Sequence, residues 1–98
     1  MNYESHLQGD KPVIVDFFTE WCEPCKLMIP VIREIKGIVG ERATILSIDV
    51  EKEDWLAELY HIQTLPTLMI FHRGQVLWRK NGISSGHEIL EHLQMVMN

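Results

Sequence analysis

The sequence predicts an α/β fold, in which a small mixed sheet of about four strands is flanked by helices. A nearly continuous run of β-branched and aromatic residues at 13–18 is typical of a strand buried on both faces. A helical pattern separates this run from a second strand at 44–50, and two further runs around Arg73-Gly74 predict a hairpin. The 98 residues, of which 46% are hydrophobic, predict one domain over 1–98, because this length has room for one core.

The N-terminal part of the chain contains the first candidate site residue. Residues 1–11 are mostly polar, and they predict one short helix that leads to a turn at Gly9-Asp10. Asp16 then interrupts the apolar strand at 13–18. Burial in an apolar strand raises the pKa of a carboxyl group, so Asp16 could exchange a proton near neutral pH. The alternative is a strand position from which Asp16 reaches solvent.

The longest predicted helix starts between Cys22 and Pro24, because proline is favoured in a first helical turn. Gly40 predicts its end, and Pro30 inside the helix predicts a kink. Apolar residues recur at steps of three and four, as on one face of a helix. This face comprises Leu27, Met28, Val31, Ile32, Ile35 and Val39.

The first two strands and the helix between them form a strand–helix–strand unit. For such a unit we expect parallel strands and a right-handed crossover. A short helix is predicted at 52–61, followed by a break at Thr64-Leu65-Pro66. The hairpin strands at 67–72 and 75–80 should pair antiparallel, which makes the sheet mixed.

A last helix is predicted in the C-terminal part of the chain. Ser85, with Glu88 three residues further on, forms a capping-box signature at its start. The apolar face of this helix comprises Ile89, Leu90, Leu93, Val96 and Met97. We interpret Trp55, in the short helix, and Trp78, in the last strand, as packing residues.

Composition and charge argue against several classes of partner. A net charge of −5, without any basic run, argues against nucleic acid and anionic membranes. No apolar run approaches the length of a membrane span. The first residues lack the basic and apolar regions of a secretory signal, so we expect a cytoplasmic protein.

Cys22 and Cys25 are the only cysteines, and two residues separate them. Such a pair is either half of a metal site or a dithiol that opens and closes as a disulfide. A structural zinc site needs two further ligands, normally another cysteine pair or a spaced histidine pair. Only His87 and His92, among five histidines, have a suitable spacing. The sequence therefore favours a redox dithiol and predicts no metal.

The position of the pair also suits redox chemistry. Cys22 should lie at the end of a central strand and at the start of a helix, where free N–H groups and the helix dipole stabilise a thiolate. Lys26 adds a cation one turn away. The thiolate is the nucleophile in disulfide exchange. Cys25, one turn into the helix, should be more buried and suited to resolve a mixed disulfide.

These features together resemble the thioredoxin family, and the similarity runs from about Val13 to the C-terminus. The cysteine pair, the strand aspartate before it and the Pro-Thr before a later strand make the match specific. The matching stretches are Val15-Asp16-Phe17, Glu20-Trp21-Cys22-Glu23-Pro24-Cys25-Lys26, Pro30, Ile48-Asp49-Val50, Leu65-Pro66-Thr67 and Gly82. The resemblance implies a thioredoxin-like fold, dithiol–disulfide exchange, and no bound cofactor beyond a reversible Cys22–Cys25 disulfide.

The resemblance also implies roles for individual residues. Cys22 matches the family's attacking cysteine, Cys25 its resolving cysteine, and Asp16 the buried aspartate proposed to help deprotonate the resolving thiol. Pro66 matches the family's cis-proline, which turns the backbone of Leu65 toward a bound substrate chain. The alternative for Pro66 is an ordinary trans turn.

The other predicted substrate-binding residues surround the cysteines or match later family positions. Trp21 precedes the pair, and its alternative is a core aromatic, a role that is compatible with substrate contact. The remaining candidates are Glu23, Pro24 and Gly82.

Three departures from the family pattern bear on the redox potential and on recognition by a reductase. The usual first strand and most of the first helix have no counterpart, so four strands rather than five are expected. Glu23 replaces the usual glycine between the cysteines. Ile45 occupies a position where many members carry a lysine thought to interact with the buried aspartate.

The leading functional prediction is a general protein-disulfide reductase that acts in electron transport and cell redox homeostasis. We expect a monomer that takes electrons from an NADPH-dependent thioredoxin reductase and passes them to disulfide-containing proteins. One alternative is a specialised redox partner of a single substrate or peroxidase. Another is a non-catalytic thioredoxin-like binding module, although such a module has no need of both thiols.

Overall fold

The computed structural model describes residues 3–97, and a four-stranded sheet with the order β2-β1-β3-β4 lies at its centre. The parallel pair is formed by β1 and β2, whereas β3 pairs antiparallel with both β1 and β4. The mixed sheet of four strands confirms the fold prediction. The strands are β1 (Val13–Phe18), β2 (Thr44–Asp49), β3 (Thr67–His72) and β4 (Gln75–Asn81).

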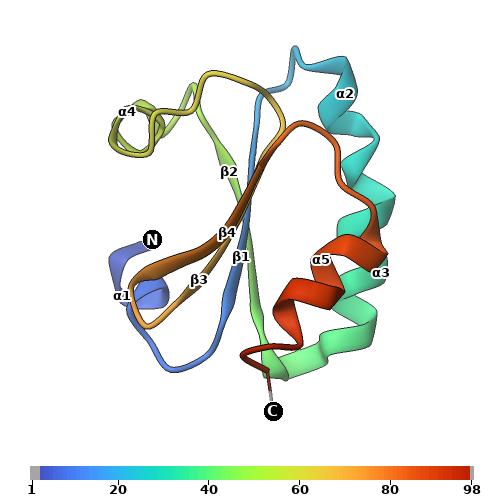
Figure 1. Cartoon of the computed structure of the whole chain (residues 1–98). Helices are drawn as coiled ribbons and strands as arrows, with labels where there is room; N and C mark the ends of the chain where they lie inside the picture. The colour runs from blue at the N-terminus through green and yellow to red at the C-terminus, as the bar shows by residue number, and fades with distance from the viewer. Residues whose placement is uncertain (1–2, 98) are drawn as a thin grey trace.

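Helices cover both faces of this sheet, as Figure 1 shows. One face carries α1 and α4, and the other carries α3 and α5. Within residues 3–97 no helix is long and apolar enough to cross a membrane. The helices are α1 (Tyr3–Leu7), α2 (Glu23–Lys26), α3 (Met28–Val39), the 3₁₀ turn η1 (Gly40–Arg42), α4 (Asp54–Leu59) and α5 (Gly86–Leu93).

The side chains of the central strand β1 alternate between the two faces. Val13, Val15 and Phe17 belong to the core beneath α1 and α4, whereas Ile14 belongs to the core beneath α3 and α5. Successive strand residues point to opposite faces. Asp16 therefore lies on the same face of β1 as Ile14, the face that α3 and α5 cover.

The long helix predicted from Cys22 onward is divided into α2 and α3. The first piece ends at Lys26 and the second begins at Met28, so Leu27 lies between them and is 60% exposed. Pro30 explains the division, because proline has no N–H and its ring displaces the carbonyl four residues earlier. That carbonyl belongs to Lys26. The kink predicted from Pro30 thus takes the form of a break one turn upstream.

The short helix α4 buries less surface than its sequence predicts. Only Leu56 is buried, whereas Trp55 is 46% and Leu59 58% exposed. The interpretation of Trp55 as a packing residue is wrong, because this helix of six residues turns only one side toward the sheet. Trp78 does pack against the core and stacks on His92, with 4.9 Å between the ring centroids.

The last helix begins as predicted and ends earlier. The Ser85 hydroxyl accepts a hydrogen bond from the amide of Glu88 at 3.1 Å, which is one half of the predicted capping box. The carboxylate of Glu88 does not supply the other half, because its hydrogen bonds go to Lys80 and Ser84. Since α5 ends at Leu93, Val96 and Met97 lie beyond it.

Candidate active site

The cysteine pair lies where the chain leaves β1 and enters α2. Cys22 is the N-cap of α2, in extended backbone conformation, and its sulfur accepts a hydrogen bond from the amide of Cys25 at 3.1 Å. Pro24 occupies the first turn, where its missing N–H leaves no bond unmade. This is the helix N-terminal position that the sequence predicts for Cys22. Amide groups at such a terminus stabilise negative charge on the capping sulfur.

The two cysteines form a disulfide, with 2.14 Å between the sulfur atoms and 5.3 Å between the Cα atoms. Cys25 is buried, with 5% of its surface exposed, whereas Cys22 is partly exposed. The prediction that Cys25 is the more buried of the two is confirmed. An incoming thiol or disulfide therefore has access to the Cys22 side of the pair.

Exposed aromatic and charged residues stand next to the two cysteines in the chain. Trp21 is 79% exposed, which excludes the alternative of a core aromatic. The ammonium group of Lys26 contacts the carboxylate of Glu23 at 2.7 Å, and both side chains are mostly exposed. In this oxidised state Lys26, the cation that the sequence places one turn from Cys22, is thus paired with Glu23.

Asp16 is buried on β1, and one of its carboxylate oxygens accepts no hydrogen bond. Only 7% of the residue is exposed, and its Oδ1 atom has no hydrogen-bond partner. Burial raises the pKa of Asp16 from 3.8 to about 6, because desolvation disfavours the charged form. The predicted burial and raised pKa are confirmed, and the alternative of a solvent-exposed position is excluded. Its cross-strand partners Ser47 and Leu68 supply no positive charge.

The segment before β3 and the segment after β4 meet beside each other. The Leu65–Pro66 peptide bond is cis, as predicted, and Pro66 is buried. The amide of Gly82 donates a hydrogen bond of 2.7 Å to the carbonyl of Pro66. Gly82 has a φ of +118°, a backbone conformation that residues with a Cβ rarely adopt. The structure therefore brings together two candidates that the sequence places far apart.

Three polar residues near Gly82 are absent from the sequence prediction of the site. Lys80, Ser84 and Glu88 form a hydrogen-bonded group that links the end of β4 to the start of α5. The only sequence signal for this group is the capping box, which predicts a different partner for the Glu88 carboxylate. Sequence spacing alone does not distinguish the two arrangements.

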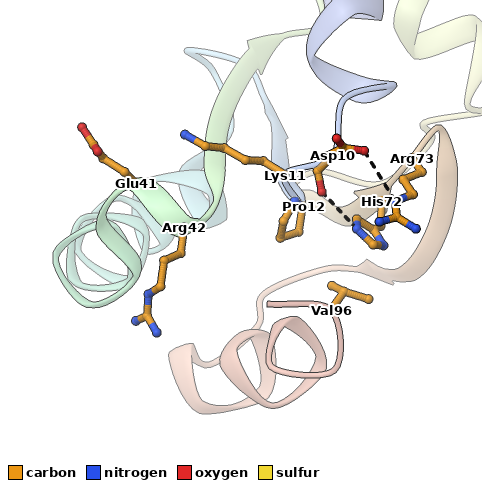
Figure 2. Close-up of a pocket in the computed structure, with 8 residues that line it drawn as sticks. All are labelled: Asp10, Lys11, Pro12, Glu41, Arg42, His72, Arg73 and Val96. Atoms are coloured by element: carbon orange, nitrogen blue, oxygen red, sulfur yellow. Dashed lines mark hydrogen bonds and ion pairs between the residues drawn. The ribbon is translucent and has the colours of Figure 1, made fainter. Parts of the chain in front are cut away.

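A hollow lies at the opposite end of the sheet from the cysteines. It has a volume of about 340 Å³, and Figure 2 shows its lining, which includes Pro12, His72 and Val96. Asp10 closes one side, because its carbonyl bonds to His72 at 3.1 Å and its carboxylate lies 3.6 Å from Arg73. Since Pro12 precedes β1 and Cys22 follows it, this hollow is not part of the redox site.

Within residues 3–97 no group of three or more histidine, cysteine or acidic side chains could hold a metal ion.

Known proteins match this arrangement over almost the whole chain. The family model described as Thioredoxin matches residues 1–95. A thioredoxin-like protein of Synechocystis sp. is 35% identical over 95 residues, which cover 96% of this chain and 90% of that protein. The chloroplastic thioredoxin Y2 of Arabidopsis thaliana is 36% identical over 94 residues, which cover 95% of this chain and 56% of that protein. The chain thus spans just over half of this plant relative.

Solved structures show the same fold. A mutant thioredoxin from Halobacterium salinarum NRC-1 matches with a TM-score of 0.87 over 98% of this chain and 83% of its own. At 23% identity this likeness concerns the fold alone. The family model and the Synechocystis relative, together with the Cys22–Cys25 disulfide at a helix N-terminus, show what the chain is. It belongs to the thioredoxin family and is a thiol–disulfide oxidoreductase.

Proposed function

We propose that the protein reduces protein disulfides with Cys22 as the nucleophile and Cys25 as the resolving thiol. The observation that carries this assignment is the difference in exposure, with Cys22 partly exposed at the helix N-cap and Cys25 buried behind it. The Cys22 thiolate attacks one sulfur of the substrate disulfide, which forms a mixed disulfide and releases the other sulfur as a thiolate. Cys25 then attacks the sulfur of Cys22, which releases the second substrate thiolate and leaves the Cys22–Cys25 disulfide.

Asp16 serves in this proposal as the group that accepts the proton of Cys25. Its raised pKa of about 6 supports the role, because a carboxyl group of this kind exchanges protons near neutral pH. The substrate chain lies against Trp21, Glu23 and Pro24 on one side of the disulfide. On the other side it lies against Leu65, Pro66 and Gly82, and the hydrogen bond from the Gly82 amide to the Pro66 carbonyl supports a common surface.

Trapping of the mixed disulfide tests the roles of the two cysteines. Cys25→Ser should accumulate a covalent adduct with a disulfide protein through Cys22, because the resolving thiol is missing. Cys22→Ser should accumulate none, since Cys25 is buried. Mass mapping of the adducts after tryptic digestion gives the result. A substrate adduct mapped to Cys25 in the wild-type protein would overturn the assignment.

The electron donor that we propose is an NADPH-dependent thioredoxin reductase, and the protein acts as a cytoplasmic monomer. Support comes from the family, and from the fact that both cysteines of the chain belong to the redox pair, which suits a compartment that keeps thiols reduced. Reduction of insulin should proceed with reductase and NADPH as well as with dithiothreitol. Activity with dithiothreitol alone would instead favour a specialised partner, and activity with neither would favour a binding module.

A further inference from the structure

The connection between β4 and α5 is fixed at both ends by one carboxylate. The ammonium group of Lys80, near the end of β4, lies 2.6 Å from Oε1 of Glu88. The hydroxyl of Ser84, just before α5, donates to the same oxygen at 2.9 Å. Ser84 is 2% exposed, so its hydroxyl depends on this partner. The Glu88 carboxylate thus spans the short segment that separates Lys80 from Ser84.

The backbone of α5 holds Glu88 in place for these contacts. Its amide donates to the Ser85 hydroxyl at 3.1 Å, which fixes the first turn of the helix independently of the carboxylate. Hydrogen bonds from Lys80 and then Ser84 lower the pKa of Glu88, so the side chain is charged at neutral pH. Charge-assisted hydrogen bonds of this kind are shorter and stronger than neutral ones.

The segment between the two fixed ends contains Gly82, which belongs with Leu65 and Pro66 to the proposed substrate groove. Gly82 adopts a φ of +118°, and its amide bonds to the carbonyl of Pro66 at 2.7 Å. Glycine has more conformations available than any other residue, so one backbone hydrogen bond holds it weakly. Ile83, which follows it, is 45% exposed and faces no core. Restraint at Lys80 and Ser84 reduces the conformations that this segment can adopt.

We propose that Glu88 is a positioning residue, which holds Gly82 and Ile83 against Pro66 and thereby sets the affinity for extended protein disulfides. This inference rests on the proposed substrate groove beside the cysteines. Glu88 takes no part in the exchange chemistry. It lies on α5, whereas Cys22 caps α2, and the Glu88 carboxylate accepts hydrogen bonds from Lys80 and Ser84. A small disulfide that touches only the cysteines should not depend on Glu88, whereas a protein that also lies on the groove should.

Comparison of two substrates with two matched variants tests the proposal. Glu88→Ala removes the carboxylate, and Glu91→Ala removes the same charge from an exposed side chain of α5 that contacts His87 at 3.3 Å. Pre-reduced protein is mixed with insulin or with a small aromatic disulfide, and oxidation is followed by tryptophan fluorescence. For Glu88→Ala the half-saturating insulin concentration should rise about three- to tenfold with little change in the saturating rate. The small disulfide should react at the wild-type rate, and Glu91→Ala should match the wild type throughout.

The amide of Gly82 gives a second readout that does not involve catalysis. Its hydrogen exchange should become about tenfold faster in Glu88→Ala and stay unchanged in Glu91→Ala, because the hydrogen bond to Pro66 opens more often. Lys80→Met, which leaves α5 intact, should change both readouts in the same direction. Unchanged insulin affinity in Glu88→Ala, or an equal loss of rate with the small disulfide, would overturn the proposal. A wild-type protein that reduces the small disulfide and not insulin would instead contradict the proposed function.

Discussion

The amide of Gly82 donates a 2.7 Å hydrogen bond to the carbonyl of Pro66, and this bond joins the end of β4 to the start of β3. Both residues lie at the end of the sheet at which β1 stops and the chain continues to Cys22. The bond needs the backbone of Gly82 in a conformation that favours glycine. The proposed substrate groove beside the cysteines therefore includes a backbone contact as well as side chains.

Gly82→Ala should destabilise the fold by about 1–3 kcal/mol, because a φ of +118° is strained for a residue with a Cβ. No atom lies within 4 Å of the added Cβ, so the cost is one of backbone conformation and not of a steric clash. Urea unfolding measures the change. Gly37→Ala is the matched control, since its Cβ also meets nothing within 4 Å and Gly37 lies inside α3. That substitution should stabilise the protein by about 0.5–1 kcal/mol.

Asp16→Asn should change how the stability of the protein depends on pH. Burial raises the pKa of Asp16 to about 6 in the folded protein, from the ordinary value of 3.8. The folded state therefore favours the protonated form. The free energy of unfolding of the wild type should thus fall by up to about 3 kcal/mol as pH rises from 4 through 6. Above pH 6 it should stay at the lower value. Because asparagine does not ionise, the stability gain of Asp16→Asn should grow over the same interval.

Urea unfolding at several pH values checks this prediction, with Glu34→Gln as a control that removes an exposed carboxylate from α3. A stability difference between Asp16→Asn and wild type that does not vary with pH would contradict it. The same variant should release the mixed disulfide more slowly, since Cys25 loses its proposed proton acceptor. Quenched-flow measurement of the intermediate follows that step.

Glu23→Gln should make the Cys22–Cys25 couple more oxidising at pH 8 by roughly 5–20 mV. The substitution removes a negative charge near the thiolate, and it also releases Lys26, whose ammonium group contacts Glu23 at 2.7 Å in the oxidised state. Lys26→Gln should shift the potential in the opposite direction. Equilibration with glutathione buffers measures both potentials. Because these groups are exposed, the shifts should shrink in 1 M salt, and equal shifts at both salt concentrations would argue against a charge effect.

Arg79→Met should loosen the end of α4. The guanidinium group of Arg79 donates to the carbonyl oxygens of Tyr60 and His61, which follow that helix. Loss of these bonds should cost about 1–3 kcal/mol, because the carbonyl groups lose a charged partner. Hydrogen exchange at the amide of Ile62, which bonds to Ala57 at 2.8 Å, should become faster. Arg33→Met, at an exposed position of α3, should leave that exchange rate unchanged.

Local signals in the sequence are sufficient to predict the strands and the cysteine site. The apolar run of β1 fixes its burial, and Pro24 marks the start of the helix that Cys22 caps. Asp16 is recognisable because a carboxyl group is unusual in such a run. Each of these features depends on neighbours in the chain, so the sequence contains the necessary information.

Features that depend on distant contacts could not be predicted in this way. Trp55 has the helical spacing of a packing residue. Its burial depends on the orientation of α4 against the sheet, which leaves the side chain exposed. Ser85 and Glu88 have the spacing of a capping box, yet Lys80 on β4 takes the carboxylate. In both cases the local pattern is compatible with two arrangements, and tertiary packing selects one of them.

The hollow beside Pro12 and the cysteine pair lie at opposite ends of β1, a strand of six residues. At about 3.3 Å per residue, this strand separates them by roughly 20 Å. A dye or surface tether attached at Arg42, which is exposed at the rim of the hollow, would therefore leave the redox face open. The protein could be immobilised on an electrode in this orientation, and large disulfide proteins would still reach Cys22 from solution.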